Sequence, residues 1–498
     1  MRALTSILKA NDLRGAVPEA WGPTEAAAIG AALAGLFAEQ PAVLVGRDCR
    51  LSGLVMAGGL IEGLIGQGRD VIDLGLVSTD AVYFASGWLN LPGVMLTASH
   101  NPPGDNGLKV MWPGAKPVGR DTGLAQIIQT AQAGLLAPAA VPGAVSQRDI
   151  FPDFARHLRS LVDLSQPRKV PGETWLGSAP VPGSDVSTDG KGTLAPAVQP
   201  QVSRPIKVVV DAGNGMGGLV TRAVLGHDAG LPALPIEVVE LYFEPDGHFP
   251  NHPANPLEPA NLVDLQEAVV AVGADGGWAF DGDADRCFWV DETGRCVPAS
   301  AIGTMIALGE VARAKANGQP AVVVHNAITS KALAEQVTAA GGQAIRTPVG
   351  HAFIKAVMAE HDAAFGAEHS GHYYFRDFFY ADTGILTALH VLAALASQDQ
   401  PMSALAGSYA PYAASGEINF RVADPPAAMA AVESCLAGVP VDRLDGITFD
   451  AWALDGWWAN LRPSNTEAVL RLNVEAVNPA DMTAVRQTIS TCLEGQTP

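Results

Sequence analysis

Apolar residues recur along the chain in short Val-rich runs, each followed by polar residues that favour the start of a helix. These runs are AVLVGRDCRLSG (42–53), KVVVDAGNGMGG (207–218) and AVVVHNAITSKA (321–332). Each run precedes a second strand candidate (70–75, 236–241 and 343–350) and then a third with a polar end, in VMLTASHNP, WAFDGDADR and AAFGAEHSGH. Strands that alternate with helical segments predict α/β domains with mixed or parallel sheets. We therefore expect three similar α/β domains with ligands at their strand ends, although chance recurrence is an alternative.

The last part of the chain has a different pattern. From about residue 415, EINFRV and VLRLNVEA alternate apolar and polar residues, as antiparallel strands do. A chain of 498 residues also exceeds a single hydrophobic core. We therefore predict α/β domains at 1–150, 151–297 and 298–412 and a smaller α+β domain at 413–498. Residues 165–205 are rich in Pro, Gly, Ser and Thr and lack periodicity, which predicts a linker or surface excursion near the start of the second domain.

Composition and charge narrow the function classes. Lys and Arg number 31 and Asp and Glu 51, so the net charge of −20 argues against a nucleic-acid or anionic-membrane partner. No apolar run approaches about 18 residues, and the N-terminal segment lacks the apolar region of a signal peptide. The five cysteines form no CxxC pair, which favours a reducing cytoplasm without disulfides. They are Cys49, Cys287, Cys296, Cys435 and Cys492. We expect a cytoplasmic protein whose partner is a small molecule.

Three acidic residues at alternate positions in FDGDADRCFWVDE predict a cation site. Asp281, Asp283 and Asp285 supply the hard oxygen ligands that Mg²⁺ prefers. They also match positions 1, 3 and 5 of a calcium-binding EF-hand, with Glu292 at position 12, but Arg286 stands where that loop needs glycine. A solvated acidic turn is the other alternative. We favour a magnesium site with an open position for a phosphate oxygen.

The segment VMLTASHNPPGDNGLK (94–109) contains a candidate residue to carry that phosphate, Ser99. Ser99 ends a predicted strand, and the turn-forming PPGDNG would let the chain fold back and bring Lys109 near it. Ser99 and His100 also suggest a hydrolase dyad, but neighbours in an extended chain point to opposite sides, and no GxSxG motif is present. A purely structural Ser-His pair and a surface lysine are the alternatives.

Two further loops carry groups suited to a sugar phosphate. LRPSNTEAVLR combines guanidinium groups with short donors, which match phosphate oxygens, although a helix-capping turn is the alternative. Its candidate residues are Arg462, Ser464, Asn465, Thr466 and Arg471. GAEHSGH offers Glu368, Ser370 and His372 to sugar hydroxyls, and its glycines let a ligand approach the backbone. A buried core histidine is the alternative there.

The motifs TASHNP, DGDADR, AEHSGH and RPSNTE, in this order and at domain-scale spacing, resemble the alpha-D-phosphohexomutases, most closely the phosphomannomutase/phosphoglucomutase branch. The resemblance implies three similar α/β domains and a fourth that closes over a central cleft. It implies that Ser99 is a phosphoserine whose phosphate oxygen binds Mg²⁺ together with the three aspartates, beside Arg286. It further implies roles in proton transfer or charge stabilisation for Arg14, Lys109 and His372, substrate contacts for His351, Glu368 and Ser370, and the phosphate grip for the RPSNTE residues.

The implied reaction interconverts hexose 6-phosphate and hexose 1-phosphate through a hexose 1,6-bisphosphate, which also serves as activator. Mannose is the first expectation and glucose a second, in a monomer or weak homo-oligomer. A phosphoglucosamine mutase, a magnesium-dependent sugar phosphatase and a non-catalytic sugar-phosphate sensor are the alternatives. A base must take the sugar hydroxyl's proton, and a lysine can do so only if its pKa is lowered. The sequence departs from the branch at Asn11, Ala468 and His369, where tyrosine, proline and methionine are usual, which bears on the sugar more than on the chemistry.

Overall fold

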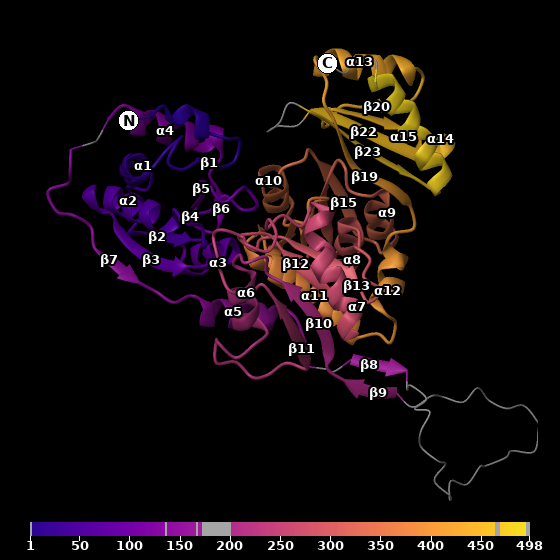
Figure 1. The fold of residues 1–498 in the computed structure, drawn as a ribbon, viewed down its shortest axis with the longest axis horizontal. Helices are drawn as coiled ribbons and strands as arrows, with labels where there is room; N and C mark the ends of the chain where they lie inside the picture. Colours follow the sequence, from indigo (N-terminus) through magenta and orange to yellow (C-terminus); the bar gives the residue numbers. More distant parts are fainter. Residues whose placement is uncertain (1, 135–136, 166–167, 172–200, 464–468, 495–498) are drawn as a thin grey trace, which may run out of the picture.

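The computed structural model describes residues 2–134, 137–165, 168–171, 201–463 and 469–494, which form four large sheets with their helices and one two-stranded ribbon (Figure 1). The first sheet has the order β1-β5-β4-β2-β3-β7, with β6 beside β5. Its strands are β1 Leu13–Ala16, β2 Ala42–Arg47, β3 Asp70–Leu76, β4 Gly93–Leu96, β5 Asp105–Trp112, β6 Lys116–Pro117 and β7 Val145–Gln147. Its helices are α1 Pro23–Leu36, α2 Gly53–Gly66, α3 Thr79–Leu89 and α4 Leu124–Gln132, and α5 Phe151–Leu161 follows.

The second and third sheets repeat one arrangement, β11-β10-β12-β13 and β15-β14-β16-β17-β18. The second comprises β10 Ile206–Asp211, α6 Gly217–Val224, β11 Ile236–Leu241, α7 Val263–Val272, β12 Gly276–Phe280 and β13 Cys287–Asp291. The third comprises α8 Ala299–Ala316, β14 Val322–Asn326, α9 Lys331–Ala339, β15 Gln343–Thr347, α10 His351–His361, β16 Phe365–Ala367, β17 Tyr373–Phe375, β18 Ala381–Asp382, α11 Gly384–Ala396 and α12 Met402–Tyr409.

The Val-rich runs form the strands β2, β10 and β14, each paired in parallel with a neighbour on both sides. Such strands are covered on both faces, which explains why their residues are continuously apolar. The following strands, β5, β13 and β17, run antiparallel to β4, β12 and β16. The predicted class of three mixed-sheet α/β units is therefore confirmed. The parallel strands β4, β12 and β16 end in the three polar motifs, TASHNP, DGDADR and AEHSGH.

The fourth sheet is antiparallel throughout, in the order β19-β23-β22-β21-β20. Its elements are β19 Ala413–Phe420, α13 Pro425–Cys435, β20 Val441–Asp442, β21 Ile447–Asp450, α14 Trp452–Asp455, β22 Trp457–Pro463, β23 Leu470–Ala476 and α15 Pro479–Glu494. Its apolar side chains, such as Phe449 and Leu472, form a cluster of their own. One continuous cluster, by contrast, joins the first three units and includes Leu44, Val208 and Val323.

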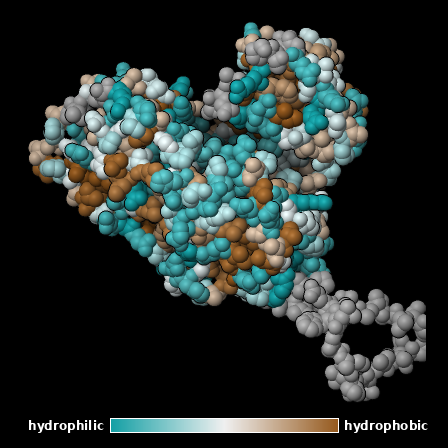
Figure 2. All heavy atoms as spheres, in the orientation of Figure 1, coloured by the Kyte–Doolittle hydropathy of each residue, from teal (hydrophilic) through white to brown (hydrophobic). Residues whose placement is uncertain are grey.

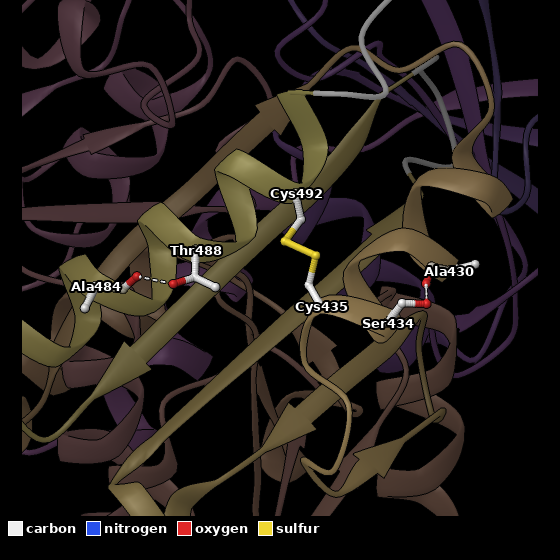
Figure 3. The surroundings of a disulfide bond; sticks show 6 residues. All are labelled: Ala430, Ser434, Cys435, Ala484, Thr488 and Cys492. Carbon is white, nitrogen blue, oxygen red and sulfur yellow. Dashed lines mark hydrogen bonds between the residues drawn. A yellow bond between two sulfur atoms is a disulfide. The ribbon is translucent and has the colours of Figure 1, made fainter.

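The fourth unit contains a disulfide between Cys435 of α13 and Cys492 of α15 (Figure 3). The expectation that no cysteines pair is therefore wrong. The two residues are 57 positions apart. They meet because α13 and α15 pack against each other, a tertiary contact that no local spacing reveals. The pairing also removes the cysteine pattern as an argument for a reducing compartment.

The ends of the Pro- and Gly-rich excursion are fixed to the molecule. A short ribbon of β8 Arg168–Pro171 and β9 Gln201–Arg204 pairs antiparallel at its base. Arg168 and Arg204 both donate to the carboxylate of Asp275, just before β12. Residues 172–200 lie outside the described residues. No helix in the described parts of the chain has the length and apolar character needed to cross a bilayer.

Candidate active site

Ser99 lies in the loop after β4, directly against the acidic turn of the second unit. Its hydroxyl donates to Asp281 Oδ2 at 2.6 Å, and the side chain is buried. Its backbone has φ 51°, in the left-handed region that non-glycine residues rarely adopt, and its amide donates to Thr97 Oγ1 at 2.8 Å. A strained residue at a functional loop persists only when its surroundings hold it there. The fold therefore presents the Ser99 hydroxyl to the acidic turn.

The acidic turn joins β12 to β13, so strands flank it and the EF-hand alternative is excluded. Atoms of Asp281, Asp283 and Asp285 lie within 4.8 Å of one another. Oδ1 of Asp283 and Oδ1 of Asp285 are buried and accept no hydrogen bond. Buried carboxylate oxygens without donors are rare, and a divalent cation satisfies them. The residues present therefore fit a magnesium ion.

The turn and the Ser99 loop touch through their backbones. A Cβ on Gly282 would lie 2.4 Å from the carbonyl oxygen of Ser99, so only glycine allows this approach. Thr79, at the start of α3, donates from its hydroxyl to Asp283 Oδ2 at 2.5 Å and from its amide to the Asp283 carbonyl at 3.0 Å. The first and second units are thus joined at this centre.

Two cations, buried Arg286 and largely buried Lys109, neutralise the turn. Arg286 donates from Nε to Asp281 Oδ2 at 2.9 Å and from Nη2 to Ser99 Oγ at 3.2 Å. Burial raises the pKa of Asp281 to about 7 against the attraction of Arg286. Lys109 Nζ on β5 donates to Asp283 Oδ2 at 2.7 Å and to Asp285 Oδ2 at 2.5 Å. A cation beside the Ser99 hydroxyl and a second one on the carboxylates are therefore in place.

A lysine can act as a base only if its pKa is lowered, and the pKa of Lys109 is raised. Its burial works toward a lower pKa, but Asp283 and Asp285 outweigh it and hold the pKa well above the ordinary value. The chain folds back through β5 as predicted, and the ammonium group reaches the acidic turn. Lys109 therefore stays charged and is suited to charge stabilisation.

The expectation that the Ser99 and His100 side chains point to opposite sides is wrong. The two side chains do not point apart: Ser99 Oγ lies 3.1 Å from His100 Nδ1, because the left-handed backbone at Ser99 breaks the extended alternation. The same nitrogen accepts from Arg286 Nη2. Arg286 and burial lower the pKa of His100 to about 2. A ring held neutral by a guanidinium group is a poor base, so the hydrolase dyad remains disfavoured.

Arg14 of β1 borders the Ser99 loop from the other side. Its Nη1 donates to the Ala98 carbonyl at 3.3 Å and to Asn101 Oδ1 at 3.1 Å, and its Nε donates to Asp12 Oδ2 at 2.7 Å. Asp12 outweighs burial and raises the pKa of Arg14. Arg14 is thus a fixed positive charge within reach of a group bound at the loop.

The AEHSGH motif follows β16, and the carboxylate of Glu368 within it is already held by protein donors. Glu368 accepts from Tyr374 Oη at 2.6 Å, from the Gly350 amide at 3.0 Å and from Asn326 Nδ2 at 3.3 Å. These contacts fix the carboxylate in one orientation. The remaining lone pairs are free to accept from sugar hydroxyls.

His372 lies where the second and third units meet. Its Nδ1 is 2.9 Å from Ser370 Oγ, and its Nε2 is 3.8 Å from Asp285 Oδ1 and 3.9 Å from Asp382 Oδ2. The structure therefore brings His372 to the edge of the acidic turn and pairs it with Ser370 of the same motif.

His351 begins α10, in the same unit. Burial and the ammonium group of Lys355 lower the pKa of His351 to about 4. Lys355 itself is buried and lies 2.9 Å from Asp382 Oδ1 and 3.9 Å from the centre of the Tyr83 ring. His351 is therefore a neutral ring, suited to a hydrogen bond with a hydroxyl group.

The predicted phosphate grip lies on the fourth sheet, apart from the other sites. Arg462 on β22 and Arg471 on β23 are neighbours across the strands, and both pair with Glu417 of β19, at 2.9 and 3.1 Å. Ser464, Asn465 and Thr466 lie outside the described residues. Figure 2 shows that the surface is hollowed between the fourth unit and the first. The two arginines thus form a paired cationic site on a different unit from Ser99.

Four further residues touch the site and escaped sequence reasoning. Thr79, Arg50, Tyr374 and Asn326 hold Asp283, the Ser99 loop or Glu368. Arg50 had a signal, because it follows β2 at the polar end of the first Val-rich run. Asn326 had the same signal, because it ends β14 at the polar end of the third Val-rich run, whereas Thr79 and Tyr374 lie outside the quoted motifs.

The four units match one family. Models of the phosphoglucomutase/phosphomannomutase α/β/α domains I, II and III match residues 5–135, 191–294 and 301–412, and the C-terminal domain model matches 417–491. The chain belongs to the phosphoglucomutase/phosphomannomutase family. It is accordingly a mutase, an isomerase that acts on hexose phosphates.

Relatives extend over the whole chain. A protein of Xanthomonas campestris pv. campestris described as phosphohexose mutases is 38% identical over 493 residues, 98% of this chain and 99% of that protein. A phosphomannomutase of Salmonella montevideo is 36% identical, covering 94% of each chain. The crystal structure of a phosphoglucomutase/phosphomannomutase family protein of Burkholderia thailandensis superposes with a TM-score of 0.81 at 27% identity, covering 99% of this chain and 98% of that one.

Proposed function

We propose that this protein is a phosphomannomutase that also accepts glucose phosphates, and that it works through a phosphoserine at Ser99 and a hexose 1,6-bisphosphate intermediate. One observation carries the proposal: the Ser99 hydroxyl is 2.6 Å from Asp281, in a turn whose neighbouring carboxylates leave two buried oxygens without donors. A serine-bound phosphate there would complete a cation site. The mannose preference is supported by the phosphomannomutase relatives.

Asp281, Asp283 and Asp285 would hold Mg²⁺, which when bound neutralises the charge of the transferring phosphoryl group. Arg286, 3.2 Å from Ser99 Oγ, would stabilise the same charge. In the transfer, the bond between phosphorus and Ser99 Oγ breaks and a bond to the sugar oxygen forms. The sugar hydroxyl's proton must go to a base. His372 is the better candidate, because Lys109 is held charged by two aspartates.

The remaining residues would position the sugar. Glu368, Ser370 and His351 would contact its hydroxyl groups, and Arg14 and Lys109 would add positive charge beside the reacting phosphate. The Arg462 and Arg471 pair, with Ser464, Asn465 and Thr466, would grip the phosphate that does not react. The bisphosphate must turn over so that C1 and C6 present their phosphates in succession. The grip therefore receives either end of the sugar.

The test compares mannose 1-phosphate and glucose 1-phosphate with a trace of the matching 1,6-bisphosphate. Ser99→Ala should lower turnover at least about 10⁴-fold while sugar-phosphate binding changes only a few-fold, since the nucleophile acts in the transition state. Ser160→Ala is the matched control, because Ser160 lies on the exposed side of α5 and its hydroxyl donates to the His157 carbonyl.

The outcomes separate the alternatives. Phosphate release that does not depend on bisphosphate would identify a phosphatase. Binding without turnover in the wild type would identify a sensor. Full activity of Ser99→Ala would rule out the phosphoserine. Higher activity with glucosamine 1-phosphate than with mannose 1-phosphate would move the substrate to the phosphoglucosamine class.

A further inference from the structure

Arg50 lies beneath the Ser99 loop, in the segment between β2 and α2. Its side chain is fully buried, although it carries a permanent charge. Buried guanidinium groups are costly unless their donors are satisfied. The position of every one of its donors is therefore informative.

The guanidinium group donates to four backbone carbonyls of one loop. Nη1 donates to Pro102 at 2.7 Å and to Asp105 at 2.8 Å. Nη2 donates to Ser99 at 2.8 Å and to Asn101 at 2.7 Å. These four bonds use all four hydrogens of the two terminal nitrogens. The carbonyl oxygens of residues 99, 101, 102 and 105 thus converge on a single group.

The guanidinium group is itself held from the other sides. Its Nε lies 3.3 Å from Asp48 Oδ2, and its own amide donates to Asp48 Oδ1 at 3.0 Å. The Phe249 ring of the second unit lies 5.6 Å from it, at cation–π distance. Arg50 therefore has little freedom to follow a loop that moves.

We propose that Arg50 is a positioning residue that fixes the Ser99 loop, and with it the phosphoserine, against the acidic turn. The inference rests on the proposed function of Ser99. The left-handed conformation of Ser99 is unfavourable for a residue with a side chain, and four converging carbonyl oxygens repel one another. The planar guanidinium group of Arg50 offsets the backbone strain and the repulsion between the oxygens, because it donates to all four carbonyls. A lysine offers three donors from one point and cannot reach all four oxygens.

The main test is Arg50→Lys, with Arg69→Lys as its matched control. Arg69 also donates to backbone carbonyls, those of Ala38 and Gln40, but in a partly exposed part of the first unit. We expect kcat of Arg50→Lys to fall about 10²-fold, because a displacement of about 1 Å has that effect, while KM stays within about three-fold. The control should keep both constants.

A second readout follows phosphate transfer directly. Wild type, Arg50→Lys and Ser99→Ala are mixed with hexose 1,6-bisphosphate, and the mass of the intact protein is followed in time. We expect Arg50→Lys to gain one phosphate about 10²-fold more slowly than wild type. A role in folding alone would lower the melting temperature without this delay in the folded fraction.

The outcomes distinguish the two proposals. If Ser99→Ala still gains phosphate, the function proposed for Ser99 fails. If Ser99→Ala gains none but Arg50→Lys matches wild type in kcat and phosphorylation rate, only the role of Arg50 is overturned. If Arg50→Lys does not fold, Asp48→Asn decides, because it leaves Arg50 in place without its anchor. It should lower kcat about three- to ten-fold at unchanged KM, and a wild-type kcat would overturn the inference.

Discussion

The centre around Ser99 and the arginine pair on the fourth sheet would act on the two phosphates of one substrate, yet they are built differently. The three aspartates and Arg286 beside Ser99 are buried, and several of them make two or more bonds next to the continuous core of three units. Buried Arg462 and partly exposed Arg471 both pair with the partly exposed carboxylate of Glu417, on a sheet with a separate core. The difference indicates that the chemistry needs a preorganised centre, whereas the grip must be able to move with its substrate.

The contacts between units also differ in burial, as the two phosphate sites do. The first and third units are joined through buried Asp80, which accepts from Thr383 Oγ1 at 2.8 Å. The third and fourth units are joined mainly by ion pairs near the surface, such as Lys331 with Asp450 and Arg346 with Asp442, beside a hydrogen bond from the Lys331 amide to buried Glu475. Partly exposed ion pairs contribute little and are screened by salt. The fourth unit is therefore the one expected to move.

The largest effect is expected at the cation site. Asp283→Asn removes a carboxylate whose Oδ1 has no other partner, so Mg²⁺ binding should be lost and turnover should fall about 10³-fold or more, equal to about 4 kcal/mol. Calorimetry with Mg²⁺ and a turnover assay measure the two effects. Asp264→Asn, whose carboxylate lies at the exposed end of the same unit, is the control. Unchanged Mg²⁺ affinity would contradict the assignment of this turn.

A pH effect is expected at the joint between the first and third units. Burial raises the pKa of Asp80 to about 7, despite hydrogen bonds from Ser78 and Thr383. Because the folded-state pKa lies above the unfolded one, the stabilisation is complete below about pH 4 and is lost as the pH rises through about 7. In wild type, the free energy of unfolding should therefore fall between pH 5 and pH 8 by a few kcal/mol relative to Asp80→Asn.

Urea denaturation in the presence of a chelator, at both pH values, measures this difference. Exposed Asp121→Asn should follow the wild-type pH profile. If the stability of wild type relative to Asp80→Asn increases with pH, the carboxyl is ionised in the folded protein. The raised pKa of Asp80 would then be contradicted.

A smaller effect is expected at the grip. Arg462→Lys replaces a forked donor with a point charge, so KM should rise about ten- to thirty-fold, or roughly 1.4 to 2 kcal/mol, while kcat stays within about three-fold. Steady-state kinetics with the two hexose 1-phosphates measure both constants. Arg421→Lys, at an exposed position of the same unit, should change neither. A loss of kcat as large as that of Asp283→Asn would remove the distinction between centre and grip.

The sequence was sufficient for the parts of the molecule that depend on local pattern. The Val-rich runs identified the buried parallel strands, because only apolar residues suit strands covered on both faces. The alternate aspartates identified the acidic turn, because their spacing is itself the chemical signal. Ser99 was singled out because polar residues at a strand end face the edge where ligands bind.

Features that depend on tertiary contacts were missed or misjudged. The pKa of Lys109 moves upward because two aspartates from the second unit face it, which no spacing near residue 109 reveals. Ser99 and His100 are hydrogen-bonded because of one left-handed residue. Cys435 pairs with Cys492 because two helices pack together. In each case the partner is distant in sequence or the backbone departs from its regular form.

The smallest effect is expected where the fourth unit meets the third. Lys331 Nζ lies 2.9 and 3.0 Å from the two carboxylate oxygens of Asp450 and 5.4 Å from the Trp452 ring, and both charged side chains are partly exposed. Lys331→Met should therefore change KM by no more than about two- to four-fold, below about 1 kcal/mol, and only at low salt. Near 0.5 M NaCl, where screening acts over a few ångström, wild type and variant should agree. Lys315→Met, whose ammonium group donates to the Ala340 carbonyl outside the joint, is the control for charge removal. A difference that persists in high salt would mean that the contact is effectively buried, and the fourth unit would then be held as firmly as the other three.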